Sequence, residues 1–212
     1  MVHQSNDPVC RTRSRLNLAG FLARSTVNGP GIRSVVWVQG CPLHCSGCFN
    51  KSSWSFSPYR HVSPDELADR ILELDGIDGV TISGGEPFAQ AGPLAVLGKR
   101  LQERGLTVLT YSGFSASRLF RKQRQSWNDL LAVTDLLVAG PFITGNPPVS
   151  PLTGSGNQQV ISLTGAIPLG GNAYPAPANL VEYTISSDGT LTTTGFPDPQ
   201  NVRQLAARCR GD

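Results

Sequence analysis

Three of the five cysteines of this 212-residue chain lie within one short stretch. Cys41, Cys45 and Cys48 have Cys-x3-Cys-x2-Cys spacing, which places three thiolates on a single loop. Cysteine thiolates are the usual protein ligands of iron–sulfur clusters. Three ligands leave one iron of a four-iron cubane without a protein ligand, and an open coordination position is typical of catalytic metal sites. The spacing therefore predicts a catalytic [4Fe-4S] cluster whose fourth iron binds a small molecule.

A structural zinc site is the alternative interpretation of the same cysteines. Such a site needs four ligands, commonly supplied by two Cys-x2-Cys pairs. No second pair is present, because Cys10 and Cys209 stand alone near the two ends, and the spacing of His44 to the cysteines is unlike that of a zinc finger. We therefore favour the cluster, and we expect Cys10 and Cys209 to be dispensable for it.

A strand that ends at the cysteine loop is the first element needed to position it. Residues 34–39 are apolar and rich in β-branched and aromatic side chains, which is typical of a buried strand. Similar patterns predict strands at 80–83, 106–110, 135–140 and 159–163. Helices are predicted between them, one beginning with the capping signature Ser63, Pro64 and Glu66, and one at 93–104. The cysteine loop then lies at the carboxyl end of its strand, where ligands bind in parallel α/β sheets.

Alternating strands and helices predict an α/β fold with a parallel sheet. Five or six strands are too few for a closed eight-stranded barrel, so we expect an open, incomplete (β/α) barrel. The predicted organisation is a flexible N-terminus at 1–15, a β/α domain at 16–165 and a C-terminal extension at 166–212. Within the extension, 181–185 and 190–194 flank Ser187-Asp188-Gly189, which predicts a β-hairpin.

Glycine motifs on both sides of the cysteines make this sequence resemble the radical S-adenosylmethionine (SAM) superfamily. The motifs are Gly29-Pro30-Gly31-Ile32-Arg33 upstream, expected to shape the rim of the site, and Gly84-Gly85-Glu86-Pro87 downstream. Within the superfamily the chain resembles the activases of glycyl radical enzymes. The pattern of the group that activates anaerobic ribonucleoside-triphosphate reductase is echoed at 28–31, 47–54, 135–142 and 154–158. The resemblance implies that the predicted barrel is of the radical SAM type.

The resemblance also implies the chemistry of the site. Cys41, Cys45 and Cys48 would hold the [4Fe-4S] cluster, and the amino and carboxylate groups of SAM would bind its open iron. Reductive cleavage would release methionine and a 5′-deoxyadenosyl radical, which takes a hydrogen atom from the substrate. Gly84 and Gly85 would let the backbone approach the methionine end of SAM, so Gly85→Val is expected to weaken SAM binding and spare the cluster.

Further contacts to SAM follow from the same resemblance. Glu86 would lie beside the methionine ammonium, Gly47 and Phe49 against the adenine, and Ser112 near the ribose or the carboxylate. Each residue also has an ordinary structural interpretation. The glycines could form a tight turn, Glu86 could be an exposed turn carboxylate, Phe49 a core residue and Ser112 a turn serine.

Composition limits the classes of partner. The net charge of +3 is modest and no nucleic-acid motif or membrane-spanning apolar run is present, so we expect neither partner. The implied partners are a glycyl radical enzyme as protein substrate and an electron donor such as flavodoxin or ferredoxin. A cluster with an exposed iron needs a reducing compartment, which predicts the cytoplasm. The alternatives are a stand-alone radical SAM enzyme acting on a peptide or small molecule, and a metal-binding interaction module without turnover.

Overall fold

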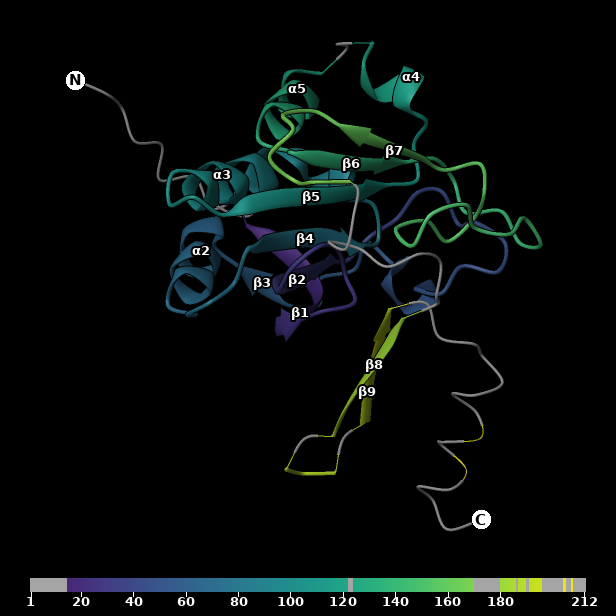
Figure 1. The fold of residues 1–212 in the computed structure, drawn as a ribbon, viewed down its shortest axis with the longest axis horizontal. Coiled ribbons are helices and arrows are strands. Elements are labelled where there is room, and N and C mark those ends of the chain that lie inside the picture. Colours follow the sequence, from purple (N-terminus) through teal and green to yellow (C-terminus); the bar gives the residue numbers. More distant parts are fainter. Residues whose placement is uncertain are drawn as a thin grey trace.

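The computed structural model describes residues 15–121, 124–169, 180–185, 187–189 and 191–195, together with residues 204 and 207. Cys10, Cys209 and nearly all of the predicted flexible segment 1–15 lie outside these residues. The main feature is an open seven-stranded sheet with the strand order β3-β1-β2-β4-β5-β6-β7 (Figure 1). The predicted α/β class is therefore confirmed. The strands are β1 (Leu16–Ser25), β2 (Arg33–Val38), β3 (His61–Val62), β4 (Gly79–Gly84), β5 (Thr107–Ser112), β6 (Leu136–Ala139) and β7 (Gln159–Ser162).

The centre of the sheet is parallel and its edges are antiparallel. β2, β4, β5 and β6 pair in parallel, as predicted. β1 pairs antiparallel with β2, and β7 antiparallel with β6, so the expectation of a wholly parallel sheet is wrong at both edges. A parallel connection needs a crossover, usually a helix. No helix is described between β1 and β2 or between β6 and β7, and these neighbours therefore run in opposite directions.

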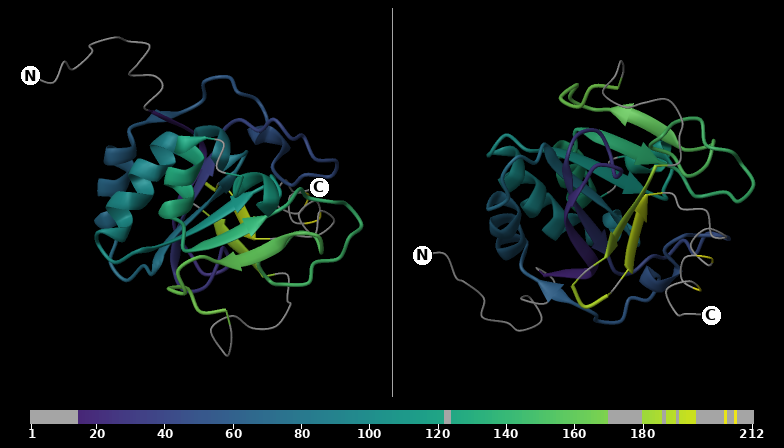
Figure 2. Two further views of the ribbon diagram at one scale, coloured as in Figure 1. Left: turned by 90° about the horizontal axis from the view of Figure 1, so that it is seen from above. Right: turned by 60° about the horizontal axis from the view of Figure 1, so that its bottom comes forward.

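Three helices, α2 (Pro64–Leu72), α3 (Ala91–Gln102) and α5 (Gln125–Ala132), cover one face of the sheet (Figures 1 and 2). The shorter helical segments are η1 (Lys51–Ser53), η2 (Pro87–Gln90) and α4 (Ala116–Leu119). α2 begins as predicted, because the Ser63 side chain accepts from the first turn and the Glu66 carboxylate accepts from the Ser63 backbone N–H at 3.2 Å. Such a capping box satisfies backbone donors that the helix leaves unpaired.

Strand alternation divides the side chains between the two faces of the sheet. Val36, Val38, Val80, Ile82 and Val108 belong to the core that packs under the helices. Because successive side chains of a strand point to opposite faces, the residues between them face away from the helices. That opposite face carries the functional cavity described below.

Arg33 is buried at the amino end of β2, away from the cysteine loop. Its side chain is 1% exposed and donates hydrogen bonds to the Thr81 hydroxyl at 3.0 Å, to the Val80 carbonyl at 2.8 Å and to the Thr107 carbonyl at 2.9 Å. The guanidinium therefore ties β2 to β4 and β5. The expectation that Arg33 shapes the rim of the site is wrong, since the cysteine loop leaves the other end of the same strand.

The predicted hairpin is confirmed as β8 (Val181–Ile185) and β9 (Leu191–Gly195). The two strands pair antiparallel from Val181 opposite Gly195 to Ile185 opposite Leu191. They form a sheet of their own on the side of the main sheet away from the three helices, and their turn points away from the main sheet (Figures 1 and 2). None of the described helices has the length and apolar character needed to cross a membrane.

Candidate functional site

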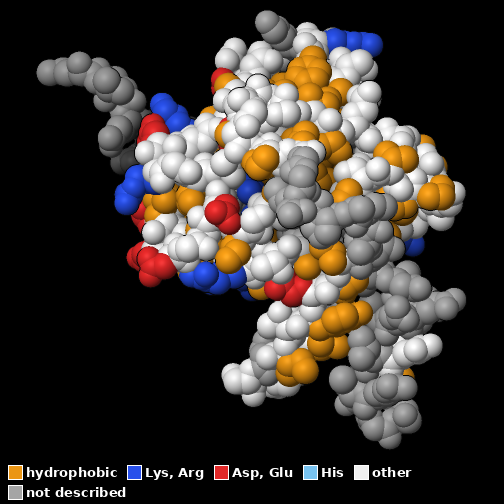
Figure 3. Space-filling view, in the orientation of Figure 1, with side chains coloured by type: hydrophobic (Ala, Val, Ile, Leu, Met, Phe, Trp, Pro, Cys, Tyr) orange, Lys and Arg blue, Asp and Glu red, His pale blue; other side chains and the backbone are white. Residues whose placement is uncertain are grey.

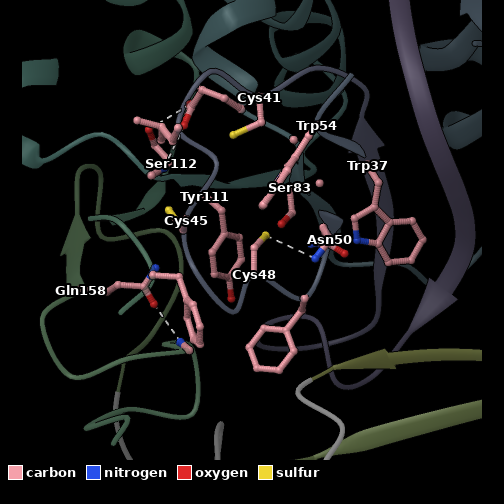
Figure 4. Close-up of a pocket in the computed structure, with 18 of the residues that line it drawn as sticks. Trp37, Cys41, Cys45, Cys48, Asn50, Trp54, Ser83, Tyr111, Ser112 and Gln158 are labelled. Atoms are coloured by element: carbon pink, nitrogen blue, oxygen red, sulfur yellow. Dashed lines mark hydrogen bonds between the residues drawn. The ribbon is translucent and has the colours of Figure 1, made fainter. Parts of the chain in front are cut away.

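A cavity of about 270 Å³ opens at the carboxyl ends of the parallel strands (Figure 4). Four segments that leave those strands contribute to it: the cysteine loop after β2, the glycine turn after β4, the turn after β5 and the loop after β6. Ligand sites of open α/β sheets lie at this end because the connecting loops converge there. The lining includes Cys41, Cys45, Cys48, Phe49, Trp54, Gly84, Gly85, Glu86, Ser112, Gly140, Phe142 and Gln158.

The cysteine loop is held to the residues that follow it by backbone hydrogen bonds. Gly40 donates to the Ser53 carbonyl at 2.7 Å and Cys41 donates to the Trp54 carbonyl at 3.0 Å. At its far end, the backbone N–H of Asn50 donates to the Cys48 sulfur at 3.3 Å. These bonds fold the loop back on itself, and all three thiols are free. Burial is the main reason that the pKa of the Cys41 thiol is raised.

The three sulfur atoms surround the cavity as separate points (Figure 4). Among the described residues, no three His, Cys, Asp or Glu side chains converge closely enough to hold a single metal ion. A mononuclear zinc site needs such convergence, whereas in a cluster each cysteine binds a different iron. The donor set therefore fits a cluster better than the zinc alternative.

Trp54 supplies a second observation that fits a bound group. Its indole Nε1 is a buried donor with no acceptor among the described protein atoms, and the side chain lines the cavity. The ring stacks on His44, with ring centroids 4.7 Å apart. Buried donors in native structures normally have partners, so an unsatisfied one at a cavity wall points to an acceptor supplied from outside the chain. Cluster sulfurs are acceptors of this kind.

Glu86 is fully buried at the end of β4, which contradicts the alternative of an exposed turn carboxylate. Its carboxylate accepts hydrogen bonds from Phe88 N–H at 2.9 Å, from the Ser112 hydroxyl at 2.9 Å and from Gly113 N–H at 2.8 Å. Burial raises the pKa of Glu86 to about 7, against these hydrogen bonds and the charge of Arg118, which lower it. The same carboxylate therefore lines the cavity and joins the ends of β4 and β5.

The two glycines of the Gly-Gly-Glu-Pro motif pack against backbone. Gly84 has φ +96°, and a Cβ there would lie 2.6 Å from the Val38 nitrogen. A Cβ on Gly85 would overlap the carbonyl oxygen of Gly40, the residue before Cys41. Gly85 also donates its N–H to Val38, and Glu86 donates to Gly40. The premise that the cysteine loop is independent of Gly85 is therefore wrong, and we now expect Gly85→Val to weaken cluster binding as well as SAM binding.

Most of the residues predicted to contact SAM line the cavity, and one lies beside it. Phe49 lines it and is 47% exposed, packing edge-on against Phe142 with centroids 5.0 Å apart, so it is not a core residue. Ser112 also lines it, although its hydroxyl already donates to Glu86. Gly47 does not line the cavity; a Cβ there would overlap the Thr144 hydroxyl.

Several cavity residues were missed by motif analysis. Trp37, Ser83 and Tyr111 lie on neighbouring strands β2, β4 and β5 and face the cavity side of the sheet. Strand alternation could have found them, because they flank the apolar positions that pack under the helices. Asn28 was identified only as part of the motif at 28–31. No sequence feature marked Thr193, Thr194 and Gly195 of the hairpin as cavity residues. These four residues also line the cavity.

Comparisons with known proteins agree with this geometry. The family model described as "4Fe-4S single cluster domain" matches residues 27–161. Pyruvate formate-lyase-activating enzymes of Staphylococcus aureus strains USA300 and NCTC 8325 / PS 47 are 36% identical to the chain over 145 residues. This match covers 65% of the chain and 57% of each enzyme. The chain therefore spans little more than half the length of these curated relatives.

A crystal structure of QueE from Escherichia coli is a weak structural neighbour. Its TM-score is 0.37 at 18% sequence identity, covering 52% of this chain and 59% of that one. This likeness is too low to bear on fold or function.

An open α/β sheet with three cysteines around a cavity at its carboxyl edge defines an iron–sulfur protein. More specifically, the chain belongs to the 4Fe-4S single cluster domain family. The predicted [4Fe-4S] cluster is thereby confirmed as its cofactor.

Proposed function

We propose that this chain is a radical SAM enzyme that generates a glycyl radical on a partner enzyme, with residues 16–165 as the catalytic domain and a partial barrel of the radical SAM type. The observation that carries the proposal is the cavity itself. It combines three cysteines, the backbone of Gly84 and Gly85, and an unsatisfied buried indole N–H at the ends of parallel strands. The 36% identity to activating enzymes supports the same reaction class.

Each group of cavity residues has its own role in the proposed reaction. Cys41, Cys45 and Cys48 would hold the cluster and would leave one iron for the amino and carboxylate groups of SAM. With both bound, an electron from an external donor, passed through the cluster, would cleave the sulfonium to methionine and a 5′-deoxyadenosyl radical. Gly84 and Gly85 let the turn after β4 pack directly against the backbone of Val38 and Gly40, so that their own backbone lines the cavity in which SAM would bind. Two further assignments remain parts of the proposal: Phe49 at the adenine, with Gly47 in the loop beside the cavity, and Glu86 with Ser112 at the polar end of SAM.

Two enzymes are candidates for the partner. The identity of the relatives as pyruvate formate-lyase-activating enzymes favours pyruvate formate-lyase. The motifs at 28–31, 47–54, 135–142 and 154–158 favour anaerobic ribonucleoside-triphosphate reductase. Either is a glycyl radical enzyme. The electron donor would be a flavodoxin or ferredoxin, and the reducing conditions that an open cluster needs place the reaction in the cytoplasm.

The test begins with anaerobic reconstitution and iron analysis. The wild-type protein should bind one [4Fe-4S] cluster, and Cys41→Ala, Cys45→Ala and Cys48→Ala should each lose it. Reduced protein should then convert SAM to 5′-deoxyadenosine. Added pyruvate formate-lyase or anaerobic ribonucleotide reductase should show a glycyl-radical EPR doublet, and the one that responds identifies the partner.

Two other results would redirect the proposal. SAM cleavage without a radical on either partner would favour the stand-alone enzyme that modifies a peptide or small molecule. A stable cluster without any SAM cleavage would instead favour an interaction module. Retention of a full cluster after any of the three cysteine substitutions would contradict the ligand assignment itself.

A further inference from the structure

A basic surface lies just beyond the turn that follows β5. Residues 118–124 have the sequence Arg-Leu-Phe-Arg-Lys-Gln-Arg, and no aspartate or glutamate occurs at 104–128. Arg118, Arg121 and Arg124 are exposed, and none of the three forms a salt bridge among the described residues. Basic side chains gather over α4 at the upper edge of Figure 3. We refer to these three residues as the arginine surface.

Two of these arginines are held by stacked aromatic rings. The guanidinium carbon of Arg118 lies 4.2 Å from the centroid of the Phe114 ring, and that of Arg124 lies 5.2 Å from the Trp127 ring centroid. Phe114 and Trp127 stack on each other with centroids 5.1 Å apart, and both are buried. Cation–π contacts restrict a long side chain without neutralising its charge. Both charges therefore remain available to an anionic partner, and less side-chain freedom is lost when that partner binds.

The turn after β5 connects the arginine surface to the cysteine loop. Gly113 precedes Phe114, and a Cβ on Gly113 would overlap the side chain of Leu43, which belongs to the cysteine loop. The Gly113 N–H also donates to the Glu86 carboxylate at 2.8 Å. Burial raises the pKa of Glu86, and the positive charge of Arg118 opposes this shift. The cysteine loop therefore packs directly on the turn from which the arginine surface projects.

The arginine surface lies outside the cavity in which SAM would bind. None of its three residues lines the cavity, and the rings of Phe114 and Trp127 belong to the core under the helices. Only residues 113–115 separate α4 from the carboxyl end of β5, so the surface is still close to the cavity edge of the sheet. The proposed reaction needs an external electron while SAM and the substrate occupy the cavity. The electron donor must therefore approach from outside it.

We propose that the arginine surface is the docking site of an acidic one-electron carrier protein that reduces the cluster. The carrier loses one electron and the cluster gains it, and no bond forms or breaks in this step. A carrier of opposite charge fits this surface because complementary charges accelerate the encounter of two proteins and orient them. Phe120 is 43% exposed in the same segment and adds an aromatic contact of the kind enriched in interfaces. This inference rests on the proposed function, which requires an external electron.

Two readouts that do not depend on SAM cleavage test the arginine surface. The first is the Kd of an oxidised, acidic flavodoxin for the reconstituted protein, measured by calorimetry at low and at high salt. The second is the rate at which reduced flavodoxin bleaches the visible absorbance of the cluster in a stopped-flow experiment. Photoreduced 5-deazariboflavin is a small uncharged reductant that needs no docking site, and it supplies the reference rate.

Charge reversal of the arginine surface should affect both readouts. The double variant Arg121→Glu with Arg124→Glu should raise the Kd and slow reduction by flavodoxin, each about tenfold at low salt. The difference should shrink at high salt, which screens exposed charges, and the deazariboflavin rate should not change. Lys99→Glu with Arg104→Glu is the matched control, because both residues are exposed and lie in the segment that leads into the amino end of β5. The control should match the wild type.

A milder pair covers the case in which the charge-reversed protein does not fold. Arg121→Gln with Arg124→Gln removes the two charges without adding acids and should act in the same direction with a smaller effect. Equal effects of the arginine pair and the control pair, or unchanged flavodoxin binding in a folded variant, would overturn the proposal. A wild-type protein that binds neither flavodoxin nor an acidic ferredoxin would overturn it as well. So would variants that lose binding only to the glycyl radical enzyme, because the surface would then dock the substrate protein.

The deazariboflavin reaction separates this inference from the proposed function. SAM cleavage with deazariboflavin, together with flavodoxin binding that ignores the arginines, would overturn the docking site and leave the radical chemistry standing. Arginine-dependent flavodoxin binding without SAM cleavage by any reductant would support the docking site and contradict the radical chemistry.

Discussion

The Ser112 hydroxyl donates a hydrogen bond to the Glu86 carboxylate at 2.9 Å and thereby joins the carboxyl ends of β5 and β4. Ser112 in turn accepts from the Phe114 N–H at 3.1 Å, which fixes the turn after β5. Glu86 also accepts from two backbone N–H groups. Glu86, which is expected to contact SAM, therefore also links the ends of two strands. Protonation of Glu86 should therefore change the free energy of unfolding of the protein in the absence of any ligand.

The stability of the cluster-free protein should fall as pH rises from about 4.5 to about 7. Burial raises the pKa of Glu86 from 4.5 to about 7, so the folded state binds this proton more tightly than the unfolded state does. The contribution is fully present below the unfolded pKa and is lost as pH rises through the folded one. Its size is on the order of 3 kcal/mol from the two values.

Urea unfolding of reduced protein at several pH values measures this effect. Glu86→Gln should remove most of the slope between these limits, because the amide does not ionise. Glu103→Gln replaces an exposed glutamate and should keep the slope. A wild-type curve that is flat over this range would mean that the hydrogen bonds to Glu86 fully offset the effect of its burial on the pKa.

Gly85→Ala should damage both cluster binding and SAM binding. Its Cβ would overlap the Gly40 carbonyl oxygen, so either β4 or the start of the cysteine loop must shift. Gly92→Ala is the control: it lies in α3, its Cβ would be 4.0 Å from the nearest side-chain atom, and it should be neutral or slightly stabilising. Iron content after reconstitution and a calorimetric SAM titration give the two readouts. Full iron content in Gly85→Ala would show that the loop adapts without loss.

The sequence was sufficient for the parts of the site that lie close together in the chain. The spacing of Cys41, Cys45 and Cys48 predicts that they are the cluster ligands, and the strand before them could be recognised from its side chains. Glu86 and Ser112 could be picked as cavity residues, but not as hydrogen-bonding partners, because 26 positions separate them. The contact between Asn28 and Thr194 spans 166 positions and depends on a hairpin docking that no local pattern encodes. The directions of the edge strands were predicted wrongly for a similar reason, since they depend on which connections lack a helix.

Cys10 and Cys209 should be dispensable, as expected from their isolation in the sequence. The double replacement by Ser should leave iron content and the rate of 5′-deoxyadenosine formation unchanged, since the cavity lining already includes the three loop cysteines. Iron analysis and chromatography of the nucleoside products check this on the reconstituted protein. Loss of about half of the iron would instead reveal a second cluster and would favour a peptide-modifying enzyme.

Trp54→Phe should change the stability of the cluster-free protein and the reduction potential of the cluster-loaded protein. Without the cluster, the buried indole N–H has no partner among the described residues, and removing such a donor relieves a cost of about 1–3 kcal/mol. The gain is offset in part because the smaller phenyl ring packs less well than the indole. The phenyl ring still keeps an aromatic face against His44. The cluster-free variant should therefore be at least as stable as the wild type in urea unfolding.

With the cluster bound, the same N–H can donate to a cluster sulfur, and hydrogen bonds to the sulfurs help to set the reduction potential. Such a bond stabilises the more negative, reduced cluster, so its loss in Trp54→Phe should lower the potential in an EPR-monitored redox titration. Trp37→Phe is the matched control, because Trp37 lines the same cavity but its nitrogen is not a buried donor without a partner. Equal potentials for Trp54→Phe and the wild type would show that the indole N–H does not bind the cluster.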